Sequence, residues 1–436
     1  MALRRGALLA GAGLVSEAVY LALAVRLPWW RYGGRLNSWC QILGRGWVPF
    51  GACLAGIGVL TGTYLWGWRA VRARQIERWA VWGFAALFAT TLFWLMPITA
   101  DLFNYLSQAH LFTDLGANPL LVAPVEFDGD RLLNAYRTVY SAYPSIYGPA
   151  WLLVSTLGTW GSHDVVAGLF CLKALAVVAY LGCAWLLERI AQQVQPASAT
   201  ETLYLFAWNP LVLLMGVGDG HNDIVMMATV LLAVWLLLCE RWTLAFGTLA
   251  LSVWIKYVSA IFLLPFAIYA WRWLVEQQRH GPWSALARGG LVLVGVSALL
   301  LLPFWLTEAS GSVEPWVAGT VERLMHPVNW QGGTPDLSTW ALGAGLLLFG
   351  VAYVALVWRL ARGCVSFQRW ADVGFVVSLL PCLLGAARSQ PWYLIWPAAL
   401  AGLSDRRWVW PVVIGLSAVM LAAQVWVEWG APGMAS

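Results

Sequence analysis

Asp101 is the residue whose position in this chain most strongly suggests chemistry. It follows an apolar run from Ala80 to Ile98 and stands in the string Pro-Ile-Thr-Ala-Asp-Leu-Phe-Asn-Tyr, residues 97–105. A carboxylate at the mouth of a membrane helix is costly to place, so such a group is usually paired, exposed to water or functional. What Asp101 does therefore depends on the side of the membrane that it faces and on the residues that join it.

Further polar residues follow Asp101 in the same stretch, up to residue 163. Residues 102–114 can form a short helix with apolar residues on one side, a pattern typical of a helix lying in the membrane interface. Segment 149–160 is too short to span a bilayer comfortably, so we expect it to be interfacial or re-entrant. The polar residues of this stretch that could join a site are Asn104, Tyr105, Gln108, His110, Asp114, Asn118 and Tyr147.

A second polar group is the string Gly-Asp-Gly-His-Asn-Asp over residues 218–223. One interpretation is a tight turn between two helices, with Asn or Asp capping the second helix. A second is contact with a substrate through Asp219, His221, Asn222 and Asp223. A third is a metal site, which needs three or more ligands converging on one point. We favour the turn with a positioning role and expect no cofactor, while a divalent metal stays open.

Three cations could serve an anionic substrate. Lys256 interrupts an apolar run, where it either snorkels to the interface or points into a cavity. His326 lies in a loop, where a lone histidine is more often solvated than catalytic. Arg388 either anchors to lipid headgroups or binds a phosphate with its planar fork. It is followed by Gln390, Trp392 and Tyr393.

Composition sets the class of protein. Of 436 residues, 61% are hydrophobic and 11% are charged, and the mean hydropathy is +0.70. A soluble domain needs far more charge to cover its surface. We expect an all-α polytopic membrane protein of about 11–13 transmembrane helices. The apolar segments are 6–25, 46–66, 79–99, 164–187, 202–217, 223–239, 242–255, 257–273, 289–306, 339–358, 371–387, 391–403 and 409–428.

The arginines predict the orientation. They cluster in the connections around residues 69–78, 272–288, 359–369 and 406–407, and clusters of Lys or Arg mark cytoplasmic loops. The loops 101–163, 218–223, 307–338 and 388–391 then face outside, together with Lys256. Loop 29–47 also falls outside although it carries three arginines, against the usual statistics.

The remaining features exclude several classes of function. The seven cysteines include no Cys-x-x-Cys pair and mostly fall within apolar segments, so no redox or zinc site is supported. No basic patch for nucleic acid and no linker are present. We expect residues 1–436 to form one transmembrane domain in the cell membrane, with loops 101–163 and 307–338 forming the active-site face on the extracytoplasmic side.

A lipid-linked sugar phosphate fits this set of residues. Its phosphate needs cations, its polyprenyl tail needs an apolar groove, and its sugar needs aromatic faces. An acceptor hydroxyl needs a carboxylate base nearby. Outside the cell no nucleotide pool is available, and the chain has no Gly-rich phosphate loop.

The order of motifs resembles the GT-C glycosyltransferases that use polyprenyl-phosphate mannose, in particular bacterial and archaeal membrane mannosyltransferases. The similar strings are Ala100–Tyr105 with Gly116–Pro119, Pro144–Pro149, Trp208–Pro210 with Gly220–Asp223, Ile255–Tyr257 with Leu264–Pro265, and Gln390–Tyr393. They run in the family's order from about residue 95 to about residue 400. Leu102 and Leu120 depart from residues that are frequent in the family, so the acceptor cannot be transferred from the resemblance.

The resemblance implies an inverting transfer of a hexose, mannose by analogy, from a polyprenyl-phosphate donor to a lipid or glycan acceptor. Asp101 would be the general base. Arg388, Lys256 and His326 would bind the donor phosphate. The residues expected to hold the substrate are Tyr105, Asn118, Tyr147, Asp219, His221, Asn222, Asp223, Gln390, Trp392 and Tyr393.

Three alternatives compete with this reading. A flippase or transporter of a lipid-linked sugar would share the groove, cations and aromatic residues, but the chain shows no inverted internal repeat. A structural subunit of an envelope complex would not need so dense a polar cluster. A metal-dependent glycosyltransferase could use Asp101 with Asp219 or Asp223.

Overall fold

The computed structural model describes residues 2–32, 38–73, 76–160, 164–277, 281–306, 337–363, 366–384 and 390–430. Within these ranges the chain is helical, and its β-type pairing is limited to an isolated bridge between Pro28 and Leu95. The prediction of an all-α fold is confirmed. Part of the predicted outer loop 307–338, with its candidate His326, lies outside the described residues, and so does Arg388.

The helices follow the apolar segments of the sequence closely. The long ones are α1 (Ala2–Arg26), α3 (Trp47–Arg72), α4 (Arg78–Phe93), α8 (Val165–Val194), α10 (Asp223–Leu238), α11 (Trp242–Ile255), α12 (Leu263–Glu276), α13 (Pro282–Leu306), α15 (Leu337–Arg362), α16 (Phe367–Leu384) and α18 (Val409–Trp429). The shorter ones include α2 (Trp39–Leu43), α5 (Asp101–Thr113), α6 (Arg131–Ala135), α7 (Pro149–Ser155), α9 (Ala199–Ala207) and α17 (Ile395–Ala401).

Length and composition support a polytopic membrane protein. In the described residues eight helices are long and apolar enough to cross a bilayer, and a bent pair of helices makes nine. Four further apolar helices of 10–17 residues include α4, α10 and α11. The predicted span 79–99 ends early, at Phe93, because Pro97 follows and the chain must turn toward Asp101. The predicted span 289–306 begins earlier, at Pro282.

The predicted helix 202–217 is broken. α9 ends at Ala207 and a π-helix runs over Val212–Gly218, with a bend of 61° between them. Pro210 cannot donate a backbone hydrogen bond, and Asn209 replaces part of the lost pattern, since its Oδ1 accepts from the backbone N–H groups of Leu211 and Val212 at 2.9 and 3.4 Å. Single-turn π segments are frequent at functional sites. This one delivers the 218–223 turn.

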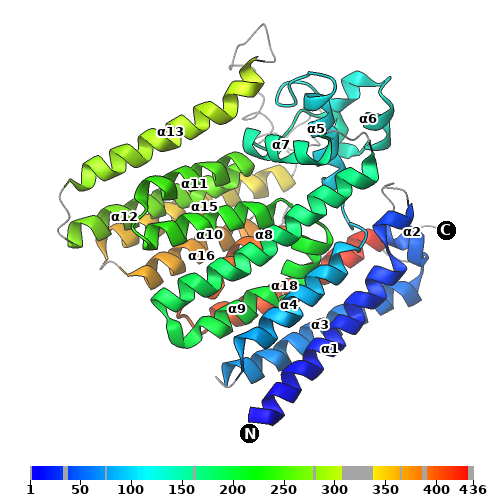
Figure 1. Ribbon diagram of the computed structural model, residues 1–436, viewed down its shortest axis with the longest axis horizontal. Helices are drawn as coiled ribbons and strands as arrows, with labels where there is room; N and C mark the ends of the chain where they lie inside the picture. The colour runs from blue at the N-terminus through cyan, green and yellow to red at the C-terminus, as the bar shows by residue number, and fades with distance from the viewer. Residues whose placement is uncertain are drawn as a thin grey trace.

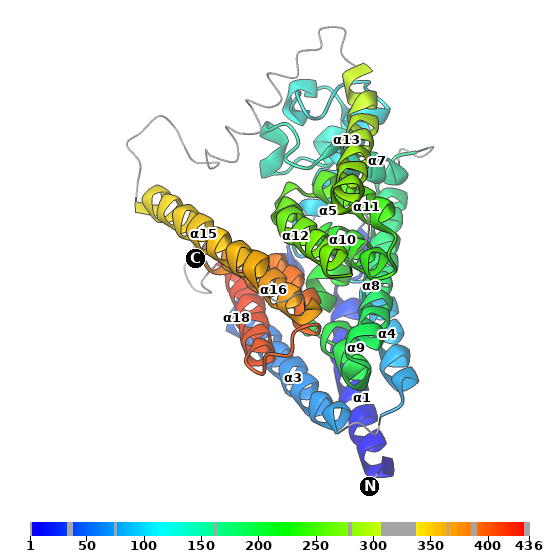
Figure 2. The same ribbon diagram turned by 90° about the vertical axis from the view of Figure 1, so that its left-hand side faces the viewer.

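The loop after α4 forms a small helical layer at one end of the molecule. Figure 1 shows α5, α6 and α7 together, at the end away from the N-terminus, and Figure 2 shows the same grouping from the side. The predicted helix over 102–114 exists as α5, which begins at Asp101, and its placement in the interface plane stays a prediction. Every residue from Asp101 to Leu111 is buried, because α6, α7 and α8 pack around this helix.

The C-terminal end of α3, which carries Arg69 and Arg72, lies near the N-terminus and far from α5–α7 (Figures 1 and 2). Arg78 sits 3.7 Å from Glu188 of α8, and Trp82 donates to the same carboxylate at 3.0 Å. These contacts join α4 to α8 at the end opposite Asp101.

Gly148 provides a test of how closely the layer of α5, α6 and α7 packs against the long helices. A Cβ at this position would lie 2.1 Å from the carbonyl oxygen of Trp254, near the end of α11. Because backbone cannot move as a flexible side chain does, we expect Gly148→Ala to lower the free energy of unfolding by about 1–3 kcal/mol. Thermal unfolding of the purified protein measures this. The exposed Gly129 has open space around it, so Gly129→Ala is the control, and equal stability of both variants would contradict the close docking.

Candidate active site

Asp101 is buried at the start of α5. Asp101 is the first residue of the helix and is 4% exposed. The N-terminus of a helix carries positive partial charge, which favours a carboxylate there. The helix starts here because Pro97 and the bent segment after it end α4, so the chain changes direction just before Asp101.

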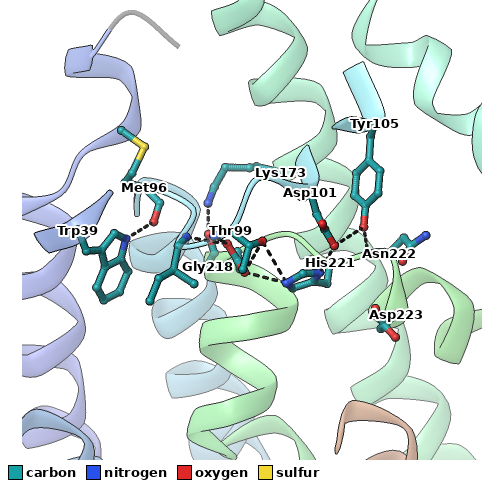
Figure 3. Close-up of polar contacts among 12 residues, drawn as sticks. Trp39, Met96, Thr99, Asp101, Tyr105, Lys173, Gly218, His221, Asn222 and Asp223 are labelled. Carbon is teal, nitrogen blue, oxygen red and sulfur yellow. Dashed lines mark hydrogen bonds and ion pairs between the residues drawn. The ribbon is translucent and has the colours of Figure 1, made fainter. Parts of the chain in front are cut away.

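His221 lies between the carboxylates of Asp101 and Asp219, and Figure 3 shows it beside Asp101. Its Nδ1 is 3.0 Å from Oδ2 of Asp101, an ion-pair distance without hydrogen-bond geometry, and its Nε2 is 2.7 Å from Oδ2 of Asp219. Asp219 is held in turn by the segment that precedes Asp101, because it accepts from the N–H of Ile98 at 2.7 Å and from Thr99. The three side chains form a carboxylate–imidazole–carboxylate relay.

This relay sets the charge of Asp101. Burial by itself raises the pKa of its carboxyl, but the charge and contact of His221, the charge of Lys256 and the hydroxyl of Tyr105 outweigh burial, so the net pKa is below the ordinary value. For His221, burial lowers the pKa, and the two carboxylates outweigh it and raise the pKa to about 9. At neutral pH the site therefore holds an imidazolium between two carboxylates.

Aromatic rings surround the relay. The hydroxyl of Tyr105 lies 3.5 Å from Oδ2 of Asp101 and accepts from the backbone N–H of Asn222 at 3.4 Å. Trp392 stacks on the imidazole of His221, with ring centroids 3.9 Å apart. The Tyr105 ring packs edge-on against Tyr147, at 5.0 Å. These rings limit how water can reach the carboxylate.

Asp223 belongs to a second, adjacent pair. Lys256 follows the last residue of α11 and donates to both carboxylate oxygens of Asp223, at 2.9 and 2.7 Å. Trp396 donates to the same carboxylate at 2.5 Å. The ammonium also lies 5.2 Å from the ring centre of Tyr393. Lys256 thus points into the cluster and does not snorkel, and its side chain keeps 16% exposure.

This arrangement bears on the metal interpretation. His221 contacts Asp219 and Asp101, whereas Asp223 contacts Lys256, so the three residues considered as ligands do not converge on one point. In the described part of the chain no group of three or more His, Cys, Asp or Glu side chains is arranged to hold a metal ion. The tight-turn interpretation of 218–223 fits better, although Asn222, at the N-cap of α10, makes no side-chain cap hydrogen bond.

A buried lysine that the sequence analysis missed lies next to the relay (Figure 3). Lys173 of α8 is 0% exposed, and its Nζ donates to the carbonyl oxygens of Leu95 at 2.8 Å and Gly218 at 2.5 Å. Both carbonyls lie where a helix ends, where the helix dipole favours a cation. Lys173 therefore joins the end of α4 to the end of the π-helix, directly before Asp219.

The structure brings most of the predicted site residues together. Asn118 is different, because both ends of its amide already bond to backbone groups. It donates to the carbonyl of Phe304 at 2.8 Å and accepts from the N–H of Leu120 at 3.0 Å. Gln390 is half-buried at the start of a short 3-10 helix, Pro391–Leu394. The residues that cluster are Asp101, Tyr105, Tyr147, Asp219, His221, Asn222, Asp223, Lys256, Trp392 and Tyr393.

Comparison with known proteins identifies the family. The model of a family described as alpha-(1->6)-mannopyranosyltransferase, N-terminal domain, matches residues 6–273, which is more than half of the chain and includes the relay and Lys256. The chain belongs to this family. It is a GT-C-like membrane glycosyltransferase of a mannosyltransferase family, as its motifs suggested.

Individual relatives agree. The chain is 27% identical over 433 residues to alpha-(1->6)-mannopyranosyltransferase A of Mycobacterium tuberculosis, an alignment that covers 93% of this chain and 79% of the relative. It is 26% identical over 173 residues to the protein of the same name from Corynebacterium glutamicum, covering 39% and 34%. Alpha-(1->6)-mannopyranosyltransferase B of that organism is 23% identical over 270 residues, covering 57% and 42%.

Lys173→Met tests how Lys173 supports the candidate site. The substitution keeps the length of the side chain but leaves two buried carbonyl oxygens without a donor, at about 1–3 kcal/mol each. We expect a lower thermal unfolding temperature and a fall in activity. Lys173→Arg keeps a donor and should recover part of both. If Lys173→Met melts and turns over like the wild type, Lys173 does not hold the turn.

The relay also predicts how stability depends on pH. The folded-state pKa of His221 is raised from 6.5 to about 9, so its contribution, up to about 3 kcal/mol, is fully present below about 6.5 and lost as pH rises through about 9. The pKa of Asp101 is lowered, so its contribution is lost only as pH falls through that lowered value. Melting curves from pH 6 to 10 should show the alkaline loss, and His221→Gln should flatten it. An equally steep loss in that variant would contradict the ion pair.

Proposed function

We propose that the protein transfers a mannosyl residue from a polyprenyl-phosphate-linked donor to a hydroxyl of a lipid or glycan acceptor, on the extracytoplasmic face of the cell membrane. The carrying observation is the buried carboxylate of Asp101, which contacts His221 at 3.0 Å and is kept ionised by it. An ionised carboxylate within reach of a sugar hydroxyl can accept its proton. The family membership supports mannose as the sugar.

The proposed reaction is a single displacement at the anomeric carbon. Asp101 takes the proton of the acceptor hydroxyl as that oxygen attacks the anomeric carbon of the mannosyl group. The new carbon–oxygen bond forms while the bond from the anomeric carbon to the phosphate oxygen breaks. The polyprenyl phosphate leaves with the electron pair, and the configuration at the anomeric carbon inverts. The relatives are alpha-(1->6)-mannopyranosyltransferases by name, which supports a mannose 6-hydroxyl as the acceptor group.

Lys256 is the described cation best placed for the donor phosphate. It is partly exposed and lies close enough to Asp101 to lower the pKa of that carboxyl. Because Asp223 already contacts it, the phosphate would share the ammonium with that carboxylate, and stabilisation of the leaving phosphate would come from a fixed charge. Arg388 and His326 remain predictions for the same role.

An apolar cavity of about 760 Å³ supports a lipid-linked donor. It is lined mainly by aliphatic side chains of α1, α3 and α18, and Asp219 is also among its lining residues. Ligand pockets commonly measure about 300–1,000 Å³. A prenyl chain in this cavity would lie next to Asp219, which contacts His221.

Asp101→Asn tests the base. The amide keeps the shape of the side chain but cannot accept the acceptor proton, so kcat should fall on the order of 10²–10⁴-fold. The assay measures transfer from purified polyprenyl-phosphate mannose to a short mannoside in proteoliposomes. Asp128→Asn, at an exposed carboxylate that pairs with Arg137, is the control and should keep full activity.

Near-full transfer by Asp101→Asn would rule out Asp101 as the base. Movement of the donor across the bilayer with no new glycosidic bond would favour a flippase over a transferase. If a chelator abolishes wild-type activity and a divalent ion restores it, the metal-dependent reaction is favoured instead.

A further inference from the structure

α5 carries more polar residues on its inner side than the relay uses. Asp101, Asn104, Tyr105 and Gln108 stand at spacings of three, four and seven, so they lie on one face of the helix. Asn104 is 4% exposed and Gln108 is 1% exposed. The face that begins with the candidate base therefore continues for two turns as a buried polar strip.

The carbonyl oxygens of this strip have no hydrogen-bond partner. Oδ1 of Asn104 and Oε1 of Gln108 are both buried and unbonded, and so is the hydroxyl of the neighbouring Ser107. Across from Tyr105, the side chain of Asn222 is 0% exposed, and neither its oxygen nor its nitrogen is bonded. Trp151, whose ring packs on Tyr105 at 4.8 Å, adds an unbonded indole N–H.

Asn222 is the most informative of these residues. It occupies the N-cap position of α10, where an asparagine side chain normally accepts from the first turn of the helix. Its side chain makes no such bond. An N-cap asparagine that leaves its own helix uncapped, while staying fully buried beside Tyr105, has both a donor and an acceptor available to something else.

Leaving these groups unbonded costs free energy. A buried polar atom without a partner costs about 1–3 kcal/mol, and native proteins bond nearly all such atoms. In the part of the chain that the structure describes, many of the unbonded buried side-chain atoms gather on α5 and on residues that contact Tyr105. Such a concentration next to one carboxylate is the pattern of a site whose partner is a ligand.

We propose that Asn104, Gln108 and Asn222 form a binding subsite for the hydroxyl groups of a hexopyranose, next to Asp101. A sugar hydroxyl both donates and accepts, so it can bond the two carbonyl oxygens on α5 and either end of the Asn222 amide. The rings of Tyr105 and Trp151 supply an apolar wall beside these groups. The inference rests on the proposed function, because Asp101 is the group that would meet the reacting hydroxyl.

The test uses apolar substitutions of similar size, Asn104→Leu and Gln108→Met. Because each removes an atom that has no partner in the protein, the thermal unfolding temperature should stay level or rise. The catalytic efficiency, in contrast, should fall. We expect kcat/KM for transfer from polyprenyl-phosphate mannose to octyl α-mannoside to fall about 10–100-fold, since a sugar hydroxyl is left unbonded.

A bonded amide gives the matched control. Asn209 accepts from Leu211 and Val212 and donates to Ser417 at 3.4 Å, so Asn209→Leu should lower the unfolding temperature. If Asn104→Leu behaves in the same way, with a lower unfolding temperature and unchanged kinetics, ordered water or a structural role explains the strip and the subsite is wrong.

Two further measurements are needed. The first shows whether the subsite holds the acceptor sugar or the donor mannosyl group, and the second separates this inference from the proposed function. A selective rise in KM for octyl α-mannoside assigns the acceptor sugar, and a selective rise in KM for the donor assigns the mannosyl group. Binding of octyl α-mannoside, followed by tryptophan fluorescence without turnover, should weaken in both variants even if the donor proves not to be a polyprenyl phosphate. Unchanged binding and kinetics, alongside an inactive Asp101→Asn, would remove the subsite and leave the transferase function in place.

Discussion

The contact of one imidazolium with two carboxylates decides how this site is built. His221 and both aspartates are almost completely buried, and charges in such a setting are stable only when they are paired and hydrogen-bonded. Asp219 meets that condition through the backbone of Ile98 and Thr99. Asp101 meets it less completely, because its contact with His221 lacks hydrogen-bond geometry. Of the two carboxylates, Asp101 at the start of α5 therefore has the fewer well-formed hydrogen bonds. In the proposed reaction it is also the one that would contact the incoming hydroxyl.

The rigidity that this geometry needs comes from helix ends. α4 stops early, the π-helix stops at Gly218, and the Nζ of Lys173 donates to a buried backbone carbonyl near each of these two helix ends. The break at Asn209 and Pro210 tilts the π-helix by 61° and so delivers the 218–223 turn to the start of α5. Interruptions that would weaken a plain membrane helix are used here to aim side chains, which is tolerated because the freed backbone groups find partners inside the protein.

The sequence predicts the scaffold well and the site in part. Apolar runs locate nearly every helix, and the arginine pattern assigned the segments with Asp101, His221 and Lys256 to one side, where the structure brings these residues together. Lys173 was missed although a lone lysine in an apolar span is itself a signal. Its partners are backbone carbonyls, which carry no mark in a sequence. The burial of α5 could not be read from its own pattern, because the layer that covers it comes from later parts of the same loop.

The burial of α5 has a consequence for catalysis in a membrane. If α5 were exposed at the protein surface, Asp101 would meet water or lipid headgroups, and its charge would be screened. Packed under α6 and α7 and against α8, it sits in a medium where the charges of His221 and Lys256 act strongly. In the proposed reaction, fixed partners would limit reorganisation around Asp101 as it takes a proton, and the covering layer would keep water away from the lipid-linked sugar. The covering layer would then have a chemical role as well as a structural one.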